Sequence, residues 1–453
     1  MYQAVTVVLG LTLLGCIFAF EMKRHVDGIV FDARFVTSCV FAVCFGIAPV
    51  GVQVLEPEDF GPFDWAMGID HAGPAFSLAT ALGLLGYLTF VAVYCAKWTE
   101  RIGRAVPRAD FDSQRALVGT VTLASLVIAG CAAAVMIKSV GGAWILIQYA
   151  MAFRAGAAPV ETEWLFLRNL VLFAVPASFL ACGHFLHASR HRFSWAVVFA
   201  VAVLLAIAGL LHSGGRLSLA AYLAVFVTYA CSRRDGRISG ATALIGAVAG
   251  MLMIVFGKYA LWIFVSPEAV DQAFWSIIDV PRQLLVMPLL EFSFPVYSLA
   301  NTLDVSPFDV PLRWFVDFPL ALVTLLPQKL LGLDQPMIIA LVNQQVLNHP
   351  VPPDLLGTGY FSAGAIGALG MAAGLAVVTR VADAFFKNSS GTGRLIGLAW
   401  AILLGFRVMY GDPTHALFSG LGLIACTAAL LAGSALRRRS RRSGEFVRTP
   451  VAS

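Results

Sequence analysis

Long runs of apolar residues, each about 20 residues in length, recur along most of the chain and alternate with short polar segments. In lipid, every backbone N–H and C=O group must find its hydrogen-bond partner within the protein, so runs of this length form spanning α-helices. About eleven spans are predicted, at residues 2–20, 35–54, 74–95, 116–137, 164–186, 194–211, 217–232, 239–265, 361–380, 394–410 and 416–434. The pattern therefore predicts an all-α polytopic membrane protein.

A stretch of mixed polarity, residues 266–359, interrupts this series of spans. It is too apolar for a solvated loop, so we expect amphipathic helices that lie in the membrane interface. The chain then divides into transmembrane helices at 1–265 and 360–434, the long loop between them, and a basic tail at 435–453. Because the rest of the chain lies in lipid, functional groups are expected in this loop and at the neighbouring span ends.

Composition and charge agree with a membrane location. Hydrophobic residues make up 59% of the chain and charged residues 13%, whereas about a quarter of the residues in a soluble domain are charged. Lys and Arg concentrate in alternate loops and in the tail, which the positive-inside bias assigns to the cytoplasm. This bias places the N-terminus and the long loop outside and the C-terminus in the cytoplasm. The net charge of +5 thus follows from topology, and no nucleic-acid partner is expected.

Motifs for familiar soluble chemistry are absent from the sequence. The eight cysteines lie in or at the edge of apolar spans without CxxC spacing, which argues against a disulfide framework and a zinc site. The sequence has no P-loop, no GxGxxG in a strand–helix context, no HExxH and no GxSxG, so energy-coupled pumping and common hydrolase chemistry have no support. We expect neither a metal nor a cofactor.

Four arginines lie on the predicted outer side, where the topology bias disfavours positive charge. They are Arg216 in a glycine turn, Arg282 after a proline, Arg313 beside an aromatic pair, and Arg407 near a span end. One interpretation is structural: Arg216 extends to the lipid headgroups, and the others pair with neighbouring carboxylates such as Asp412. The other is functional, because a guanidinium can bind a phosphate through two parallel hydrogen bonds.

Candidate proton acceptors lie near these arginines in the sequence. His349 precedes a proline run, while Asp412 and His415 occupy the short turn after Arg407. An intramembrane arginine is costly and is by default a functional-site hypothesis. Together with a nearby carboxylate or imidazole, it would combine a cation with a general base.

Several segments resemble a known family. The stretch from Phe318 to Lys329, then Asn343, then Pro352–Pro353 and Gly357–Phe361 before a glycine-rich span, is similar to the C-terminal half of O-antigen and capsule repeat-unit polymerases of the Wzy type. The Ser213–Ser218 turn is similar to a small-residue-plus-arginine turn of that family. The resemblance covers roughly residues 205–420, but the chain has Leu326-Pro327-Gln328 where members often have Ile-Pro-Arg, and spaced Arg-to-Gly motifs do not follow Arg216 or Arg282.

The resemblance implies a GT-C-like membrane glycosyltransferase of the bacterial inner membrane, a polysaccharide polymerase that needs neither nucleotide sugar nor metal. The growing glycan on a polyprenyl diphosphate would be the donor, and a lipid-linked repeat unit would be the acceptor. The four arginines and Tyr360 would bind diphosphate or glycan, and His349, Asp412 or His415 would take the proton from the acceptor hydroxyl. The implied partners are the polyprenyl-diphosphate-linked oligosaccharide, the bilayer, a chain-length regulator and a flippase.

Three alternatives remain open. A related O-antigen ligase would move finished glycan onto a lipid. A polyprenyl-phosphate-sugar transferase would use an acidic residue of the first outer loop, where Glu56, Glu58 and Asp59 occur. A lipid-linked sugar flippase or transporter would instead place paired charges in broken helices near the middle of the membrane.

Overall fold

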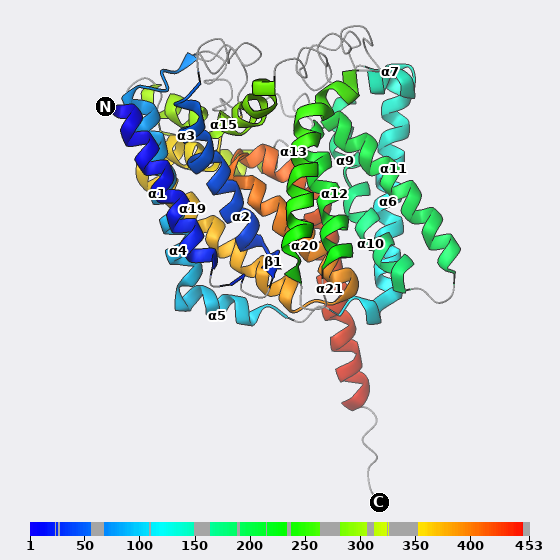
Figure 1. Cartoon of the computed structure of the whole chain (residues 1–453). Coiled ribbons are helices and arrows are strands. Elements are labelled where there is room, and N and C mark those ends of the chain that lie inside the picture. The colour runs from blue at the N-terminus through cyan, green and yellow to red at the C-terminus, as the bar shows by residue number, and fades with distance from the viewer. Residues whose placement is uncertain are drawn as a thin grey trace, which may run out of the picture. The chain divides into compact units, whose positions relative to one another are not determined.

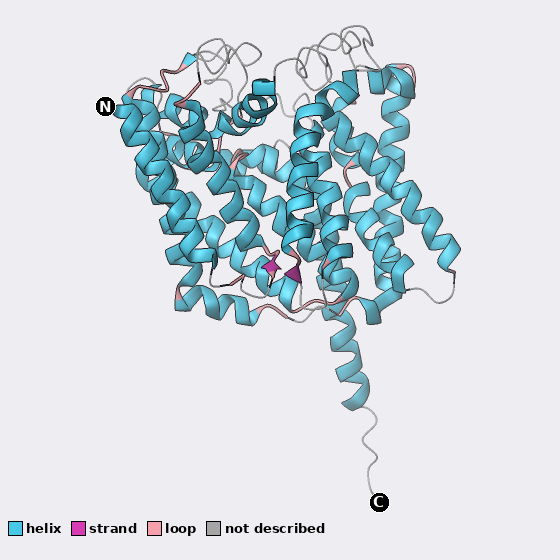
Figure 2. Ribbon diagram, in the orientation of Figure 1, coloured by secondary structure: helices cyan, strands magenta, loops and turns pink. Residues whose placement is uncertain are grey.

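The computed structural model describes residues 1–446 except 23, 26–27, 56–67, 108–109, 149–163, 188–190, 214, 233–236, 263–280, 306–311, 324 and 326–351. Helices dominate the described residues, and one pair of two-residue strands is the exception (Figures 1 and 2). These strands, β1 (Ile29–Val30) and β2 (Arg237–Ile238), pair in an antiparallel manner, with Ile29 opposite Ile238. An all-α fold class is therefore confirmed in its main feature.

Helices cover most of the described chain. In the first half of the chain they are α1 (Tyr2–Met22), α2 (Ala33–Phe41), η1 (Ala42–Ile47), α3 (Ala48–Val52), α4 (Pro74–Cys95), α5 (Lys97–Ala105), η4 (Asp112–Gln114), α6 (Arg115–Val140), α7 (Ala143–Gln148), η5 (Leu165–Leu167), α9 (Arg168–Val171), α10 (Ala174–His187) and α11 (Arg192–Ser213). In the second half they are α12 (Gly215–Cys231), α13 (Gly240–Trp262), α15 (Pro281–Val305), α16 (Asp317–Val323), α19 (Leu355–Lys387), α20 (Gly391–Gly405), η6 (Phe406–Val408) and α21 (Pro413–Phe446).

Nine helices within the described residues are long and apolar enough to cross a membrane. They run over Tyr2–Met22, Ala33–Val52, Pro74–Cys95, Asp112–Val140, Arg168–His187, Arg192–His212, Leu355–Lys387, Gly391–Val408 and Pro413–Arg437. Two further apolar helical segments, Leu217–Cys231 and Gly240–Gly250, are shorter and fall in the remaining two predicted spans. A multi-pass membrane protein is thus confirmed, while the count of eleven stays a prediction.

The chain forms two compact units. Unit 1 comprises Met1–Val106, Ala220–Ala384 and Leu398–Phe418, and unit 2 comprises Pro107–Leu219, Phe385–Gly397 and Ser419–Ser453. In unit 2, α6 packs against α9 and α10, and α10 packs against α11. The Asp112 carboxylate caps the start of α20 by accepting from the Thr392 amide at 3.1 Å and its hydroxyl at 2.9 Å.

Unit 1 is built on close helix contacts at small residues. A side chain on Gly10 of α1 would meet the Gly46 carbonyl oxygen at 2.9 Å, so the α1 and η1 backbones approach closely. The hydroxyls of Thr6 and Ser77 are 2.8 Å apart and join α1 to α4. Without water in the membrane core, such packing and interhelical hydrogen bonds hold helices together.

A row of buried aromatic rings on α4 fills the centre of unit 1. Tyr87, Phe90 and Tyr94 recur every three or four residues and therefore share one helix face. Their ring centroids are 6.1 Å and 6.0 Å apart in sequence order, and Phe41 of α2 lies 5.5 Å from Tyr87. This row fixes α4 against α2.

Helix α15 comes from the predicted loop, but it is more deeply buried than a surface helix would be. Its residues Leu290, Val296 and Tyr297 are fully buried, and it packs against α3, α4, α13 and η1. The contact with α3 is so close that a side chain on Gly51 would lie 2.6 Å from Leu289. In contrast, α16 leaves Phe318 exposed, as expected for an interfacial helix.

Helix α19 is broken near its start. Ala363 and Gly364 leave the helical conformation, with φ of +64° at Gly364, a value that favours glycine. Gly359 and Gly367 then lie in contact, since a side chain on Gly359 would meet the Gly367 carbonyl oxygen at 2.4 Å. In a continuous helix, residues eight positions apart are separated by about 12 Å. The chain therefore folds back on itself, so the segment from Leu355 lies against the longer helix that follows.

We predict that Gly359→Ala will destabilise the protein by about 1 to 3 kcal/mol, because the new methyl group would collide with backbone that cannot move aside. The measurement is the melting temperature of the detergent-purified protein. Gly370→Ala is the control in the same helix, because a side chain there meets nothing within 4 Å. Equal melting temperatures for the two variants would show that the halves of α19 do not pack together.

Candidate functional site

Arg407 lies in η6, the short 3-10 turn that follows α20. Its Nε donates to the Leu403 carbonyl oxygen at 3.2 Å. Its Nη1 is buried and makes no hydrogen bond to any group of the described chain. The charge of Asp412 acts on the guanidinium, but no hydrogen bond to that nitrogen accompanies it. A buried cationic donor without an acceptor is costly. Arg407 is therefore the first residue to consider as a functional group in the segment between α20 and α21.

Asp412 begins the next helix. Its Oδ1 accepts from the Thr414 amide at 2.9 Å, and its carbonyl oxygen accepts from the Ala416 amide at 2.9 Å. With Pro413 at the first helical position, this is the usual arrangement of an N-cap residue. Burial raises the pKa of the Asp412 carboxyl; the charge of Asp317 adds to this, while the backbone donors and Arg407 oppose it. The carboxylate is therefore a stronger proton acceptor than an exposed aspartate.

Tyr410 connects this turn to its neighbours. Its ring lies 5.2 Å from Phe294 of α15 and 5.3 Å from His415 in the first turn of α21, measured between centroids. His415 is exposed. The turn after Arg407 thus carries a carboxylate, an aromatic ring and, beside that ring, an imidazole. We name Arg407, Tyr410, Asp412 and His415 the Arg407 cluster.

A backbone hydrogen bond joins the Arg407 cluster to the start of α19. The Gly411 amide donates to the Pro353 carbonyl oxygen at 2.9 Å. Gly411 fits so closely that a side chain there would lie 2.4 Å from the Leu355 Cα. The proline run and the short turn after Arg407, which are far apart in the sequence, therefore meet here.

Asp354 caps α19 from a fully buried position. Its Oδ1 accepts from the amides of Leu356 at 2.8 Å and Gly357 at 3.0 Å, while its Oδ2 has no hydrogen-bond partner in the described part of the chain. Burial raises the pKa of the Asp354 carboxyl to about 7, although the two amide donors act in the opposite direction. In the sequence Asp354 simply follows the proline run, and nothing local indicates that it is buried.

The Arg313 guanidinium forms an ion pair with Asp317. Its Nε lies 2.8 Å and 2.7 Å from the two carboxylate oxygens of Asp317, and its Nη2 contacts the same carboxylate. The Arg313 and Trp314 amides donate to the carbonyl oxygens of Phe361 and Ser362 at the break in α19. Arg313 thus takes the structural pairing that the sequence offered as an alternative, and its neighbour Asp317 acts electrostatically on Asp412.

The remaining predicted site residues are less well placed by the structure. Tyr360 is half-buried in the first part of α19, and Arg282 is exposed in the first turn of α15. The backbone of Arg216 lies in the first turn of α12, in unit 2, but its side chain is outside the description, as is all of His349. Within unit 1 the structure therefore places Arg407, Asp412 and His415 in and after one turn, while Arg216 and Arg282 stay predicted site residues.

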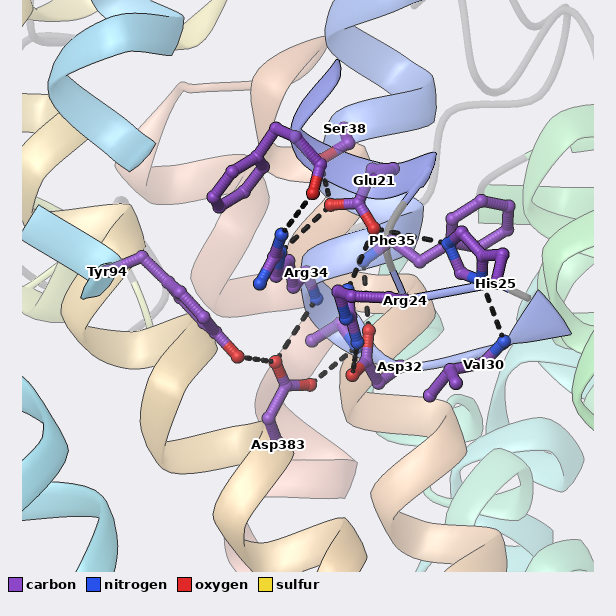
Figure 3. A network of polar contacts seen from close by, with 12 residues as sticks. Glu21, Arg24, His25, Val30, Asp32, Arg34, Phe35, Ser38, Tyr94 and Asp383 are labelled. Carbon is purple, nitrogen blue, oxygen red and sulfur yellow. Dashed lines mark hydrogen bonds and ion pairs between the residues drawn. The ribbon is translucent and has the colours of Figure 1, made fainter. Parts of the chain in front are cut away.

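A second polar cluster, which sequence analysis missed, centres on Glu21 at the end of α1 (Figure 3). Its Oε2 accepts from Arg24 Nη1 at 2.8 Å and from His25 Nε2 at 3.2 Å. Its Oε1 accepts from Arg34 Nε at 2.9 Å and from the Ser38 hydroxyl at 3.1 Å. An acidic residue in the last turn of an apolar span was the sequence signal that could have identified it.

Two more carboxylates complete this Glu21 network. Asp383 of α19 accepts from the Ala33 amide at 2.7 Å through Oδ1 and from the Tyr94 hydroxyl at 2.6 Å through Oδ2 (Figure 3). Asp32 accepts from the Phe35 amide at 3.0 Å and pairs with Arg24. Burial by itself lowers the pKa of Arg24, but the charges of Asp32 and Glu21 outweigh it and raise that pKa. Each oxygen of the three carboxylates is occupied, so the network is structural.

No family model matches the chain, and neither a curated protein nor a solved structure matches it significantly. In the part of the chain that the structure describes, no three His, Cys, Asp or Glu side chains gather in a way that could hold a metal ion. The Arg407 cluster is therefore the feature of this chain that bears on its function.

We predict that Glu21→Ala will destabilise the protein by about 3 to 5 kcal/mol, since it removes the carboxylate partner of half-buried Arg34 and one of the two carboxylate partners of Arg24. Glu100→Ala is the matched control, because the Glu100–Arg104 pair is exposed and such pairs contribute little. Melting temperatures of the two purified variants measure the difference. A loss of similar size in both would mean that the Glu21 network is not a buried ion cluster.

A separate prediction concerns pH. The ordinary pKa of 3.8 for Asp354 is raised to about 7 in the fold, so the folded protein holds a proton that the unfolded chain has released across this interval. Stability contributed by this group is therefore lost as pH rises from about 4 to about 7. Asp354→Asn keeps an acceptor for the two amides but cannot ionise. The melting temperature of this variant should exceed that of the wild type at about pH 8, and the difference should shrink as the pH falls towards about 4; a difference that is the same at about pH 8 and about pH 4 would contradict this.

Proposed function

We propose that the protein is a membrane glycosyltransferase that extends a polysaccharide. In this proposal it transfers the growing glycan from a polyprenyl diphosphate to a lipid-linked repeat unit, without a metal ion. The observation that carries the proposal is the buried Nη1 of Arg407, which finds no acceptor among the described residues and lies in the turn that ends a candidate membrane span. An anionic group that enters from the membrane surface would supply that acceptor.

The chemistry assigns roles to the Arg407 cluster. The acceptor hydroxyl attacks the anomeric carbon of the donor, the bond to the diphosphate oxygen breaks, and the diphosphate leaves with the electron pair. Arg407 would stabilise the charge that develops on this leaving group, a contribution on the order of 10² to 10³ in rate. Asp412, whose pKa is raised, would receive the hydroxyl proton, and exposed His415 is the second candidate for that role.

The other predicted substrate-binding residues also have roles in the proposal. Arg282, exposed at the start of α15, and Tyr360, at the start of α19, would contact the glycan or the diphosphate, and Arg216 would add a further cation. Arg313 would act indirectly, because its guanidinium is bound to Asp317. The proposed topology places these residues outside a bacterial inner membrane, with the N-terminus outside and the C-terminus in the cytoplasm.

The break in α19 favours a second candidate, a transporter of lipid-linked sugars. Irregular backbone at membrane depth occurs where it is buried in protein or lines a cavity, as in the broken helices of transporters. Here, however, backbone amides of Arg313 and Trp314 cap the break, and neither Ala363 nor Gly364 carries a charge for a substrate. The acidic alternative, a transferase that uses Glu56, Glu58 or Asp59, concerns residues outside the described part of the chain.

We predict that Arg407→Ala will lower the rate of elongation by about 10² to 10³, because it removes a contact to the leaving diphosphate. Arg407→Lys should also be impaired, since lysine keeps the charge but lacks the planar pair of donors. The measurement is the length distribution of glycan made by purified protein in liposomes with lipid-linked repeat units. Exposed Arg192 of α11 gives the control Arg192→Ala.

The outcomes separate the candidates. An unchanged length distribution in Arg407→Ala would end the diphosphate-binding role and most of the case for a polymerase. Movement of lipid-linked sugar across the liposome membrane by a wild-type protein that does not elongate the glycan would favour the transporter.

A further inference from the structure

Hydrogen bonds join the first turn of helix α5 to the end of α4. Ala96 between them is extended, with ψ of 141°, and turns the chain so that α5 leaves the direction of α4 (Figure 1). The Thr99 hydroxyl lies 2.7 Å from the Val93 carbonyl oxygen and 2.7 Å from that of Ala96. One turn later, Gly103 packs against Arg380 of α19, where a side chain would meet Arg380 Cγ at 3.5 Å. The buried side of α5 is thus Thr99 and Gly103.

The opposite side of α5 exposes two adjoining edges. Trp98 and Ile102 are 51% and 40% exposed, and their spacing of four residues places them together as an apolar edge. Lys97 and Arg101 are also exposed, again four residues apart, and form a basic edge beside it. A helix with a basic edge next to an aromatic and aliphatic edge has the pattern of one that lies in a membrane interface.

The cations of the basic edge are available. Glu100 pairs with Arg104 at 2.6 Å, whereas within the described chain neither Lys97 nor Arg101 takes part in an ion pair. Helix α4 is a candidate membrane span that ends at Cys95, so α5 begins two residues beyond the span. At that depth the groups that match free cations beside a tryptophan are lipid phosphates.

We propose that α5 is an interfacial helix that binds the anionic phospholipid surface, with Trp98 and Ile102 at the headgroup–acyl boundary and Lys97 and Arg101 on lipid phosphates. This inference does not depend on the proposed enzymatic function. It is consistent with the basic-loop bias, which assigns this end of α4 to the cytoplasmic leaflet.

Lipid bound at α5 should stabilise unit 1. Arg380, against which Gly103 packs, has its guanidinium carbon 5.0 Å from the Tyr94 ring centroid. Tyr94 in turn donates to Asp383 of the Glu21 network (Figure 3). An occupant that holds α5 in place therefore supports the helix ends that this network joins, and binding to the folded form raises the melting temperature.

The test compares the full-length protein in nanodiscs of phosphatidylcholine alone and with added phosphatidylglycerol. We expect the wild type to melt several degrees higher with phosphatidylglycerol, and this gain to shrink in high salt. Lys97→Gln/Arg101→Gln should lose the gain. Glu100→Gln/Arg104→Gln is the matched control, because it alters the same helix twice, keeps its net charge, and should retain the gain.

A second measurement locates the helix directly. Lipids brominated near the headgroup quench tryptophan fluorescence, and the difference between the wild type and Trp98→Phe isolates Trp98 among the nine tryptophans. We expect the Trp98 component to be quenched. Absence of this quenching, or an equal phosphatidylglycerol gain in Lys97→Gln/Arg101→Gln and wild type, would overturn the proposal. If the melting temperature rises only when an acidic protein is added, and not with phosphatidylglycerol, the partner of α5 is a protein and the proposal is likewise overturned.

Discussion

Unit 1 depends on the pairing of charges in a medium where water cannot solvate them. Glu21, at the end of α1, accepts from four side chains, of which Arg34 and Ser38 belong to α2. Asp383 extends the network to α19 and to Tyr94 of α4. A carboxylate in low dielectric is tolerated only when each oxygen is bound. The same requirement that makes these charges costly thus makes their arrangement specific, because a shift of one of the four helices would break contacts that satisfy the buried carboxylates.

Against this background, Arg407 and Asp354 stand out as groups that do not obtain full pairing. Arg24 and Arg34 each contact carboxylates, whereas among the described residues Arg407 has a buried nitrogen with no acceptor and Asp354 a buried oxygen with no donor. Both belong to segments joined by the Gly411–Pro353 hydrogen bond. Incomplete pairing costs stability, and proteins accept such costs at functional sites. This contrast, rather than any single residue type, is the reason to seek the site at this end of unit 1.

Glycines allow the close backbone contacts between the start of α19 and the turn that carries the Arg407 cluster. Gly359 and Gly367 let α19 fold back, and Gly411 lets the turn after η6 touch the start of α19. The break exposes carbonyl groups that a continuous helix would satisfy, and the Arg313 and Trp314 amides bind two of them. In lipid, an irregular segment of this kind needs such partners. Residues of the long loop are therefore part of the helical framework, and they also bring Asp317 near Asp412.

Apolar run length alone determined that the chain is a multi-pass helical membrane protein, because a span must be about 20 residues long to cross the bilayer. The sequence also placed Asp412 and His415 shortly after Arg407. Only the tertiary structure decided that α15 is buried, that Arg407 lacks an acceptor, and that Asp383 binds Ala33, 350 positions away. Periodicity and spacing describe neighbours along the chain, whereas burial and long-range pairing depend on which helices pack together, and that is settled by the shape and small residues of all of them at once.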